Sequence, residues 1–432
     1  MSKNDFKIEN GVLYEYVGTD KNVIIPKEVK TIYEFAFNHT SYTETVVIPE
    51  SVEKIYGFAF AYCYTLKKVV IPGTVKEIKY HTFSHCTKLE SVTIAEGVEK
   101  IDSGAFAWCY ALNSVELPES IKEIGDSAFL QCRKLQNINV PENLTNIGSG
   151  TFAGCNKLAD EDGFIVINGI LFGYAGKSKD IVIPDKVRKL DDCFLHVSTV
   201  SARSVSSITL PDTVRDFNPF TFRDCRKLAD ENGFVIVRNV LCKYFGKDAH
   251  VVVPHGVEKI STFAFRTCKS ISSIELPDTV KEIEPCTFLE CRNMADENGF
   301  VIVRNVLYAY YGKKKNVVIP DGVEEISSYA FRYRRYITSV TIPDTVKEIG
   351  EGAFQCCEKL ADENGFVIIR NVLYRYFGKE KTIVVPDGVE KISAYAFEGC
   401  KNIPSITLPK SVKEIHEKAF KMCYYKVQII KL

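Results

Sequence analysis

The chain has 432 residues with 46% hydrophobic content, and its 55 Lys and Arg residues balance 55 Asp and Glu residues. A net charge of zero lacks the basic footprint that nucleic-acid binding requires, and no run of about 18 apolar residues predicts a membrane span. The first residues, MSKNDFKIEN, show no apolar core of a signal peptide. Two locations therefore remain as alternatives. One is the cytoplasm, and the other, if a leader has been removed, is the cell surface or the exterior.

The chain opens with two apolar runs on either side of Asn10-Gly11, a pair typical of a two-residue β-hairpin turn. We expect residues 1–22 to form an N-terminal hairpin that caps the first repeat. Related segments add 20 residues before alternate repeats, and we expect hairpin modules at 159–183, 229–253, 295–319 and 361–385. The last three copies carry Arg-Asn at the turn, as in Arg370-Asn371, where the turn signal is weaker because Arg adopts positive φ less readily than Gly.

The rest of the chain is a 23-residue repeat, of which one copy, LESVTIAEGVEKIDSGAFAWCYA, spans residues 89–111. Val92 and Ile94 alternate with polar residues, which predicts a short strand with one buried face. The proline that follows the strand in most copies lacks an N–H and ends strand pairing. The residue at this place marks fourteen copies: Pro26, Pro49, Pro72, Ala95, Pro118, Pro141, Pro184, Pro211, Pro254, Pro277, Pro320, Pro343, Pro386 and Pro409.

A Phe and a Cys three residues after it recur in the second half of the repeat. Stacking in register would align the Phe rings in the centre and the thiols in a buried column. A metal or redox site is the other interpretation of the cysteines, but the C-x-x-C spacing is absent. The recurring Phe residues are Phe37, Phe60, Phe83, Phe106, Phe129, Phe152, Phe222, Phe265, Phe288, Phe331, Phe354, Phe397 and Phe420. The recurring Cys residues are Cys63, Cys86, Cys109, Cys132, Cys155, Cys225, Cys268, Cys291, Cys357, Cys400 and Cys423.

The pattern L-x-x-V-x-I-P-x-x-V-x-x-I-x-x-x-A-F-x-x-C, repeated over about residues 8–425, resembles the BspA-like leucine-rich repeat family. The resemblance implies a right-handed solenoid, and many proteins of this family are displayed on microbial surfaces and bind host or matrix proteins. We therefore expect a β-rich α/β fold: one continuous, curved, right-handed leucine-rich-repeat solenoid over residues 1–432, with hairpin inserts and short outer helices. An apolar, uncapped C-terminal strand at 424–432 predicts self-association through that end.

The outward residue at the centre of each inner strand, on the concave face, is the first candidate for binding a protein partner, because it varies while the inward residues do not. After each hairpin this residue is apolar, which suggests that it is covered: Ile24, Val182, Val252, Val318 and Val384. In the plain repeats the candidate residues are polar: Thr93, Glu116, Asn139, Thr209, Glu275, Thr341 and Thr407.

Each hairpin carries two aromatic positions or their equivalents. One interpretation is an aromatic row that binds a glycan or peptide, and the other is that these side chains pack on the solenoid. The apolar outward residues favour packing. The paired positions are Tyr14 and Tyr16, Phe172 and Tyr174, Cys242 and Tyr244, Tyr308 and Tyr310, and Tyr374 and Tyr376.

Two repeats depart from the pattern, and such departures often mark functional sites. Residues 191–211 lose the Phe-Cys signature, and their polar side chains either bind a ligand or absorb an insertion (His196, Ser198, Thr199, Ser201, Arg203 and Ser204). In the other, Arg334 replaces the column cysteine, and a buried guanidinium must leave the core or find a carboxylate. Because Arg and Tyr are typical binding anchors, the second candidate group is Arg332, Tyr333, Arg334, Arg335 and Tyr336, with local repacking as the alternative.

No catalytic motif is recognised, and polar features recur in copy after copy where an active site would occur once. His81 and His85 lack the glutamate of a zinc-protease motif, and Gly176-Lys177-Ser178 lacks the first glycine of a phosphate-binding loop. The sequence thus predicts no catalytic residue, no metal and no cofactor. It predicts a non-catalytic scaffold that binds a protein partner. The resemblance to BspA-like proteins implies that this binding serves adhesion or interaction with a host or matrix protein. The alternatives are an intracellular assembly module and a glycan-binding protein that uses the hairpin tyrosines.

Overall fold

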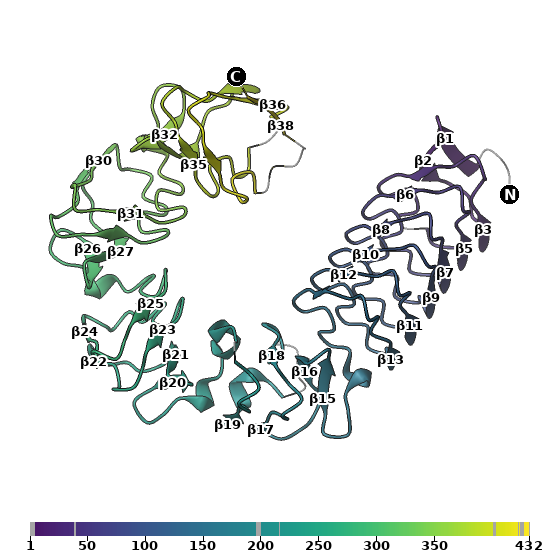
Figure 1. Cartoon of the computed structure of the whole chain (residues 1–432), viewed down its shortest axis with the longest axis horizontal. Helices are drawn as coiled ribbons and strands as arrows, with labels where there is room; N and C mark the ends of the chain where they lie inside the picture. The colour runs from purple at the N-terminus through teal and green to yellow at the C-terminus, as the bar shows by residue number, and fades with distance from the viewer. Residues whose placement is uncertain are drawn as a thin grey trace. The chain divides into compact units, whose positions relative to one another are not determined.

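The computed structural model describes residues 5–38, 40–195, 200–215, 217–400, 403–421, 423 and 427–431. The chain divides into two compact units, Met1–Leu228 and Ala229–Leu432. Each unit is a β-solenoid in which successive repeats add short parallel strands to two walls (Figure 1). The expected solenoid is confirmed, and its continuity over residues 1–432 stays a prediction.

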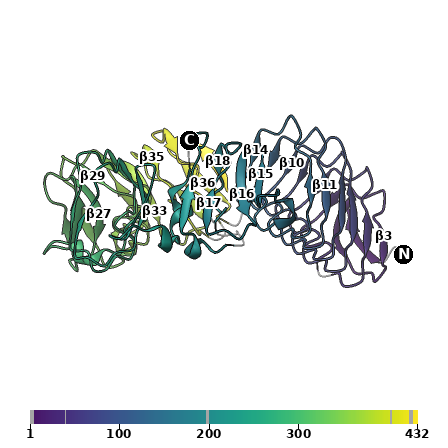
Figure 2. The same cartoon turned by 90° about the horizontal axis from the view of Figure 1, so that it is seen from below.

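The inner wall of the first unit begins with a six-stranded parallel sheet in the order β13-β11-β9-β7-β5-β3. Figures 1 and 2 show this sheet from two directions. Its strands pair one repeat apart, so that Val69 lies opposite Val92 and Val92 opposite Val115, and these three side chains are buried. The predicted alternation of inward and outward residues is therefore confirmed. The strands are β3 (Asn22–Ile24), β5 (Thr45–Val47), β7 (Lys68–Ile71), β9 (Ser91–Ile94), β11 (Ser114–Glu116) and β13 (Asn137–Ile138).

The second wall of this unit is made of two-residue strands whose isoleucines stack in register, as Ile78, Ile101 and Ile124 do. These side chains are buried and face the same core as the inner strands. The strands are β4 (Thr31–Ile32), β6 (Lys54–Ile55), β8 (Glu77–Ile78), β10 (Lys100–Ile101), β12 (Glu123–Ile124), β14 (Asn146–Ile147) and β18 (Lys189–Leu190).

Five antiparallel strand pairs occupy the segments in which the sequence shows extra residues. In each, the second strand also pairs in parallel with the next strand of the second wall, as Leu171 does with Leu190. The pairs are β1 (Phe6–Glu9) with β2 (Val12–Tyr16), β15 (Phe164–Ile167) with β16 (Ile170–Tyr174), β20 (Phe234–Val237) with β21 (Val240–Tyr244), β26 (Phe300–Val303) with β27 (Val306–Tyr310), and β32 (Phe366–Ile369) with β33 (Val372–Tyr376).

The inner wall is interrupted after each internal antiparallel pair. In the first unit β17 (Asp180–Val182) pairs only with β19 (Ser207–Thr209). In the second unit the inner wall consists of three separate sheets: β22 (His250–Val252) with β24 (Ser273–Glu275), β28 (Asn316–Val318) with β30 (Ser339–Thr341), and β34 (Thr382–Val384) with β36 (Ser405–Leu408) and β38 (Gln428–Lys431). Its second wall contains β23 (Lys259–Ile260), β25 (Glu282–Ile283), β29 (Glu325–Ile326), β31 (Glu348–Ile349), β35 (Lys391–Ile392) and β37 (Glu414–Ile415).

The Arg-Asn turns adopt the same left-handed backbone as the Asn-Gly turns. Arg370 and Asn371 have φ of 49° and 61°, and Asn168 and Gly169 have 49° and 73°. The guanidinium of Arg370 donates hydrogen bonds to the backbone carbonyls of Val346 and Pro343, which offsets the cost of the left-handed conformation. The turn thus forms despite its weaker sequence signal, because the Arg side chain bonds to the preceding repeat, a contact that the turn residues alone did not predict.

The two predicted columns are confirmed in the core. Phe83 and Phe106 stack with ring centroids 5.4 Å apart, and Phe106 and Phe129 stack at the same distance. The column cysteines are free thiols, buried or half-buried, and many donate a hydrogen bond to the carbonyl of the column Phe of the preceding repeat, as Cys86 does to Phe60 at 3.1 Å. The thiols are therefore hydrogen-bond donors as well as apolar filling.

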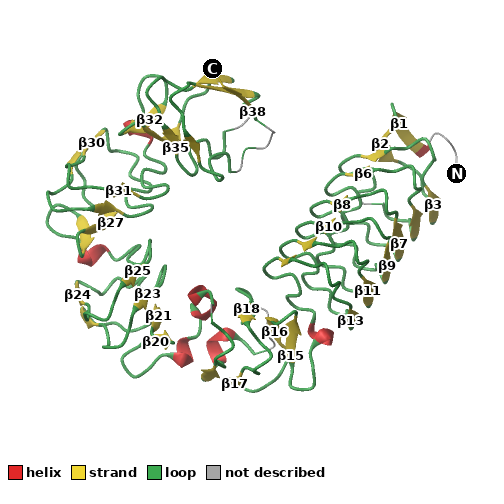
Figure 3. Cartoon of the chain, viewed as in Figure 1, coloured by secondary structure: helices red, strands yellow, loops and turns green. Residues whose placement is uncertain are grey.

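The outer segments are mainly turns (Figure 3). The described residues contain no α-helix, so the α part of the expected α/β class is not seen in them. None of their helices has the length and apolar character required to cross a membrane. The 3₁₀ helices are η2 (Asn156–Leu158), η3 (Ala202–Ser204), η4 (Pro219–Phe222), η5 (Arg226–Leu228), η6 (Arg292–Met294) and η7 (Glu358–Leu360).

Candidate protein-binding site

The seven polar candidates occupy one register position on the inner strands, but the structure brings only some of them together. In the first unit Thr93 lies opposite Glu116, and Asn139 follows β13 in the next repeat. The other four lie in different sheets, each opposite an apolar residue that follows an antiparallel pair: Thr209 opposite Val182, Glu275 opposite Val252, Thr341 opposite Val318, and Thr407 opposite Val384. All seven are exposed except Thr407, which is half-buried.

Two of these candidates are engaged with their neighbours. The side-chain amide of Asn139 accepts a hydrogen bond from the Leu117 amide at 2.6 Å and donates one to the Leu117 carbonyl at 2.7 Å. Glu275 lies 3.3 Å from Nε2 of His250 on the paired strand. Asn139 therefore closes the end of the six-stranded sheet, while Thr93 and Glu116 present their side chains to solvent.

The interpretation that the apolar outward residues are covered is wrong. Between 55% and 67% of each side chain is exposed: Ile24, Val182, Val252, Val318 and Val384. The physical reason is that the outward side of the inner strands is open along the wall, since Val47 and Val70, at the same register position in the central strands β5 and β7, are exposed as well. The preceding hairpin contributes a strand to the second wall and leaves these residues uncovered.

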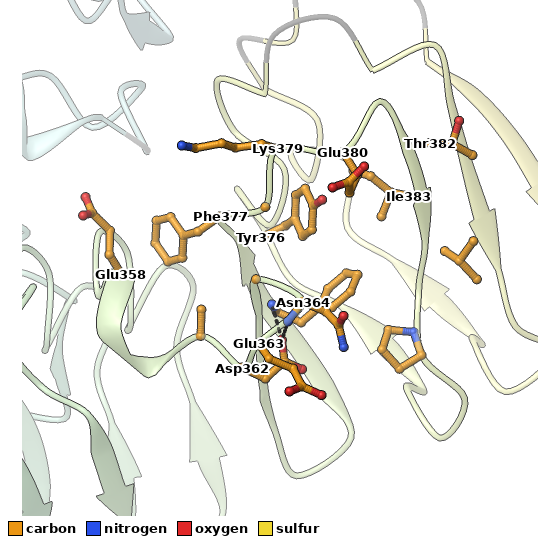
Figure 4. A pocket seen from close by; sticks show the side chains of 16 residues that line it. Glu358, Asp362, Glu363, Asn364, Tyr376, Phe377, Lys379, Glu380, Thr382 and Ile383 are labelled. Carbon is orange, nitrogen blue, oxygen red and sulfur yellow. Dashed lines mark hydrogen bonds between the residues drawn. The ribbon is translucent and has the colours of Figure 1, made fainter.

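A cleft of about 890 Å³ lies beside the edge strand β34 and is named the β34 cleft. Thr382, Ile383 and Val384 form one side, and the turn that enters the hairpin, residues 361–366, forms the opposite side (Figure 4). Four carboxylates and one ammonium group line it: Glu358, Asp362, Glu363, Glu380 and Lys379. The cleft therefore combines the unpaired edge of a strand with an acidic wall.

The turn that faces β34 is held by backbone hydrogen bonds to one carboxylate and by a close approach of two glycines. One carboxylate oxygen of Asp362 accepts hydrogen bonds from the amides of Asn364 at 3.0 Å and Phe366 at 2.9 Å. Gly365 has φ of +87° and lies so close to Gly378 that an added Cβ would come within 2.4 Å of the Gly378 amide nitrogen. The recurring Asp at hairpin entry is thus a structural residue, as its repetition in the sequence indicated.

A second cleft of about 600 Å³ lies in the first unit beside the edge of β13. Glu116 and Asn139 line it together with Val166 and Ile167 of the hairpin strand β15. Two sequence-predicted residues, Glu116 and Asn139, therefore lie at an interruption of the inner wall that the repeat pattern did not predict.

The hairpin aromatic positions pack in the core, so the packing interpretation is confirmed. Nine of the ten paired positions are buried, and only Tyr14 is exposed. Tyr310, for example, is fully buried against Phe300 with ring centroids 5.0 Å apart. The interpretation of these hairpin side chains as an aromatic row that binds a glycan is therefore wrong.

The Arg332–Tyr336 group is divided between packing and surface. Arg334 donates from Nε to the carbonyl of Tyr310, and Tyr336 donates from its hydroxyl to the carbonyl of Gly312. Arg334 is half-buried, and its acceptor is a backbone carbonyl where a carboxylate was the expected partner. Tyr333 and Arg335 are exposed, and Arg335 pairs with Glu358 at 3.5 Å. Arg332 is half-buried and stacks on Tyr333 with 4.7 Å between the guanidinium carbon and the ring centroid.

Two partly exposed rows of aromatic side chains were missed by the sequence reasoning. Tyr14, Tyr33 and Tyr56 follow one another at 5.3 and 5.2 Å between ring centroids. A parallel row contains Phe35, Phe58 and His81, at 5.4 and 5.0 Å. The available signal was an aromatic residue two places before the column Phe in three consecutive repeats. These rows offer rigid contact area to a protein partner.

The other irregular repeat, residues 191–211, is described only in part. His196, Ser198 and Thr199 lie outside the described residues, while Ser201 and Arg203 are exposed. The buried Asp191 accepts hydrogen bonds from the amides of Gly150 and Cys193, both at 2.9 Å. In regular repeats a backbone carbonyl accepts the bond equivalent to that from Gly150, so Asp191 takes over this structural role.

His81 and His85 are ring-stacking residues. His81 stacks on Phe58, and His85 lies between Tyr62 and Trp108 at 4.7 and 4.5 Å between ring centroids. Burial lowers the pKa of both imidazoles. Among the residues that the structure describes, no three His, Cys, Asp or Glu side chains are grouped to hold a metal ion.

The sequence matches the BspA type leucine rich repeat region in six copies, over residues 7–109, 77–201, 238–361 and 301–425. These segments cover most of the chain and both units. No curated protein matches the chain.

Several solved structures are similar to this chain. A leucine-rich repeat protein from Bacteroides ovatus is 22% identical, with 99% of this chain and 91% of that chain covered and a TM-score of 0.36. A leucine rich cell surface protein from Faecalibacterium prausnitzii is 22% identical, with 100% and 92% covered and a TM-score of 0.31. A leucine-rich repeat protein from Eubacterium ventriosum is 18% identical, with 97% and 92% covered and a TM-score of 0.32.

Proposed function

This chain belongs to the BspA-type leucine-rich-repeat family, and from that membership we propose that it is a non-catalytic scaffold that binds a protein partner. The observation that carries the proposal is the outward face of the inner strands. Thr93 and Glu116 are exposed in adjacent repeats, whereas the inward residues Val92 and Val115 are buried. A rigid sheet that holds variable side chains on a fixed spacing suits recognition of another protein surface.

The test is binding by the intact chain. Bait protein is incubated with extract of the producing cell and with host extract, and each recovered partner is then titrated against purified variants. Thr93→Arg combined with Glu116→Arg should weaken the partner's affinity at least tenfold, because both substitutions place a bulky charge on the face. Lys88→Glu changes an exposed residue outside this face and is the matched control. Equal affinity of all three proteins would contradict the assignment to the inner-strand face.

We propose adhesion to a host or matrix protein as the setting, and assembly inside the cell is the alternative. The right-handed sense of the solenoid, and the hairpins as inserts in it, belong to the same proposal and are supported by family membership. Protease shaving of intact producing cells separates the two settings. Release of peptides from this chain supports display at the surface. Retention of the whole chain in the cytosolic fraction contradicts it.

Self-association through the C-terminal strand is a further part of the proposal. Within the described residues β38 pairs with β36 on one edge and with no strand on the other, and Ile429 and Ile430 are both more than 40% exposed. An uncovered edge with apolar side chains favours pairing with another chain. Sedimentation should show a concentration-dependent dimer that Ile430→Lys reduces, and a monomer at every concentration would contradict this part.

A further inference from the structure

We infer that the β34 cleft receives an extended, basic peptide segment of a partner protein, which adds to the edge of β34 as a further strand. This inference rests on the proposed scaffold function and specifies where and how one partner segment binds. It is carried by three observations in the second unit: the unpaired edge of β34, the room beside it, and the charge of the residues around it.

The edge of β34 exposes backbone groups that can accept a strand. The Val385 amide donates to the Thr407 carbonyl at 2.9 Å, so this side of the strand is occupied by β36. Neighbouring residues of a strand point their amides and carbonyls to opposite edges, so those of Thr382 and Val384 point away from β36. No strand in the described part of the chain pairs with that edge. It is therefore a template for backbone hydrogen bonds.

The space beside this edge is large enough and is shaped in advance. Its volume of about 890 Å³ lies in the range of ordinary ligand sites, roughly 300–1,000 Å³. The facing turn is held by the Asp362 carboxylate and by the close approach of Gly365 and Gly378, and Tyr376 and Phe366 lie behind it with ring centroids 4.9 Å apart. A preformed cleft loses less conformational entropy when a peptide enters. The Val384 side chain, 58% exposed, offers an apolar contact on one face of the added strand.

The charge of the cleft identifies the occupant as basic. Asp362, Glu363 and Glu380 are exposed and form no ion pair with a described Lys or Arg, and Lys379 is the only cation in the lining. In the first unit the equivalent of Asp362 is Asp160, which already pairs with Lys186 at 2.5 Å. In the preceding hairpin module Lys314 donates to the equivalent of Asn364, Asn298, at 3.0 Å. Among the described residues, Asp362 thus lacks the lysine partner that Asp160 has, and Asn364 lacks the one that Asn298 has.

The experiment is selection of peptides from a random heptapeptide display library on the immobilised full chain. Enriched peptides are synthesised and their dissociation constants are measured. We expect enrichment of alternating β-branched sequences that contain Lys or Arg. We also expect slower amide hydrogen exchange at Thr382 and Val384 when a peptide is bound. A library that yields no enriched peptide, or peptides without basic residues, would overturn the inference.

Variants of the strand edge test the backbone contact itself. Val384→Pro removes the outward amide and should weaken an enriched peptide at least tenfold, whereas Val384→Thr keeps the amide and should weaken it less than threefold. Val318→Pro makes the same change at the same register position of β28 and is the matched control. N-methylation of alternate peptide amides reproduces the loss without altering the protein, so misfolding of the proline variant cannot account for the result.

Each outcome separates this inference from the scaffold proposal. Unchanged affinity for Val384→Pro, or an equal loss for Val318→Pro, would overturn strand addition at β34 and leave binding by the inner-strand face intact. Glu363→Gln combined with Glu380→Gln should reduce the preference for a Lys-containing peptide over its Glu counterpart by at least fivefold, and Glu417→Gln, which removes an exposed carboxylate elsewhere, should not. No change in this preference would contradict a basic occupant. If the intact chain binds no partner at all, the scaffold proposal itself fails.

Discussion

The thiol of Cys86 donates a hydrogen bond to the backbone carbonyl of Phe60, in the preceding repeat, at 3.1 Å. The same contact joins Cys109 to Phe83, also across 26 residues of sequence. Burial raises the pKa of the Cys86 thiol well above its usual value, so the proton that makes this bond is retained. The cysteine column thus connects neighbouring repeats with side-chain hydrogen bonds that run beside the strand pairing.

Cys86→Ala should lower the free energy of unfolding by about 1–3 kcal/mol, because it removes the sulfur volume and one of the two donors to the Phe60 carbonyl, which also accepts from the Cys63 amide at 3.4 Å. Chemical denaturation followed by circular dichroism measures the change. Cys356→Ala, at a half-buried cysteine outside the column, should cost less than about 0.5 kcal/mol. Equal losses in the two variants would show that the column bond contributes nothing.

Phe106→Ala should cost about 3–5 kcal/mol, because it opens a cavity in the middle of the ring column. Phe35→Ala removes an exposed ring that stacks on Phe58, and its cost should be about 1 kcal/mol. Phe106 is fully buried, whereas 48% of Phe35 is exposed. Thermal denaturation of both variants provides the comparison, and a larger loss for Phe35→Ala would contradict the assignment of the core.

Arg370→Ala should lower the free energy of unfolding by about 1–2 kcal/mol, because it keeps the left-handed backbone and loses the bonds to Val346 and Pro343. Arg370→Gly loses the same bonds but relieves the backbone strain, so its cost should be smaller by about 1 kcal/mol. Urea denaturation measures both. A Gly variant less stable than the Ala variant would argue against strain at this position.

His81→Phe should reduce the dependence of stability on acidity. Burial lowers the pKa of His81, so its contribution is complete above the ordinary value of about 6.5 and declines as pH falls through the lowered pKa. The melting temperature of the parent protein should therefore fall more steeply than that of the variant below about pH 6.5, while the Phe ring preserves the stack on Phe58. Parallel curves for the two proteins would exclude a contribution from this imidazole.

The regular parts of the fold could be predicted because a fixed period places equivalent side chains above one another. The register of Val69, Val92 and Val115 and the stacking of Phe83 on Phe106 both follow from a spacing of 23 residues. The exposure of Val384 could not be predicted in this way. It depends on the route that the chain takes through the hairpin, which adds a strand to one wall and none to the other.

The candidate site was predicted only as a register position. Thr93 and Glu116 lie where the pattern placed them, but the interruptions that assign Thr209, Glu275 and Thr341 to separate sheets result from tertiary pairing. The same holds for Arg334, whose acceptor is a carbonyl 24 residues earlier. A partner at that distance leaves no local signal in the sequence. The missing cysteine therefore showed that this repeat is irregular, but not which group would accept the hydrogen bond from Arg334.

The span of the column contacts has a consequence for how the protein is made. Cys86 bonds to Phe60 across 26 residues of sequence, and Lys67 bonds to Glu44 of the neighbouring repeat across 23 residues. Because these separations do not grow with the number of repeats, the entropy lost in closing each loop stays constant along the chain. A repeat can dock on its predecessor as soon as it leaves the ribosome, and the growing polypeptide need not wait for its distal end.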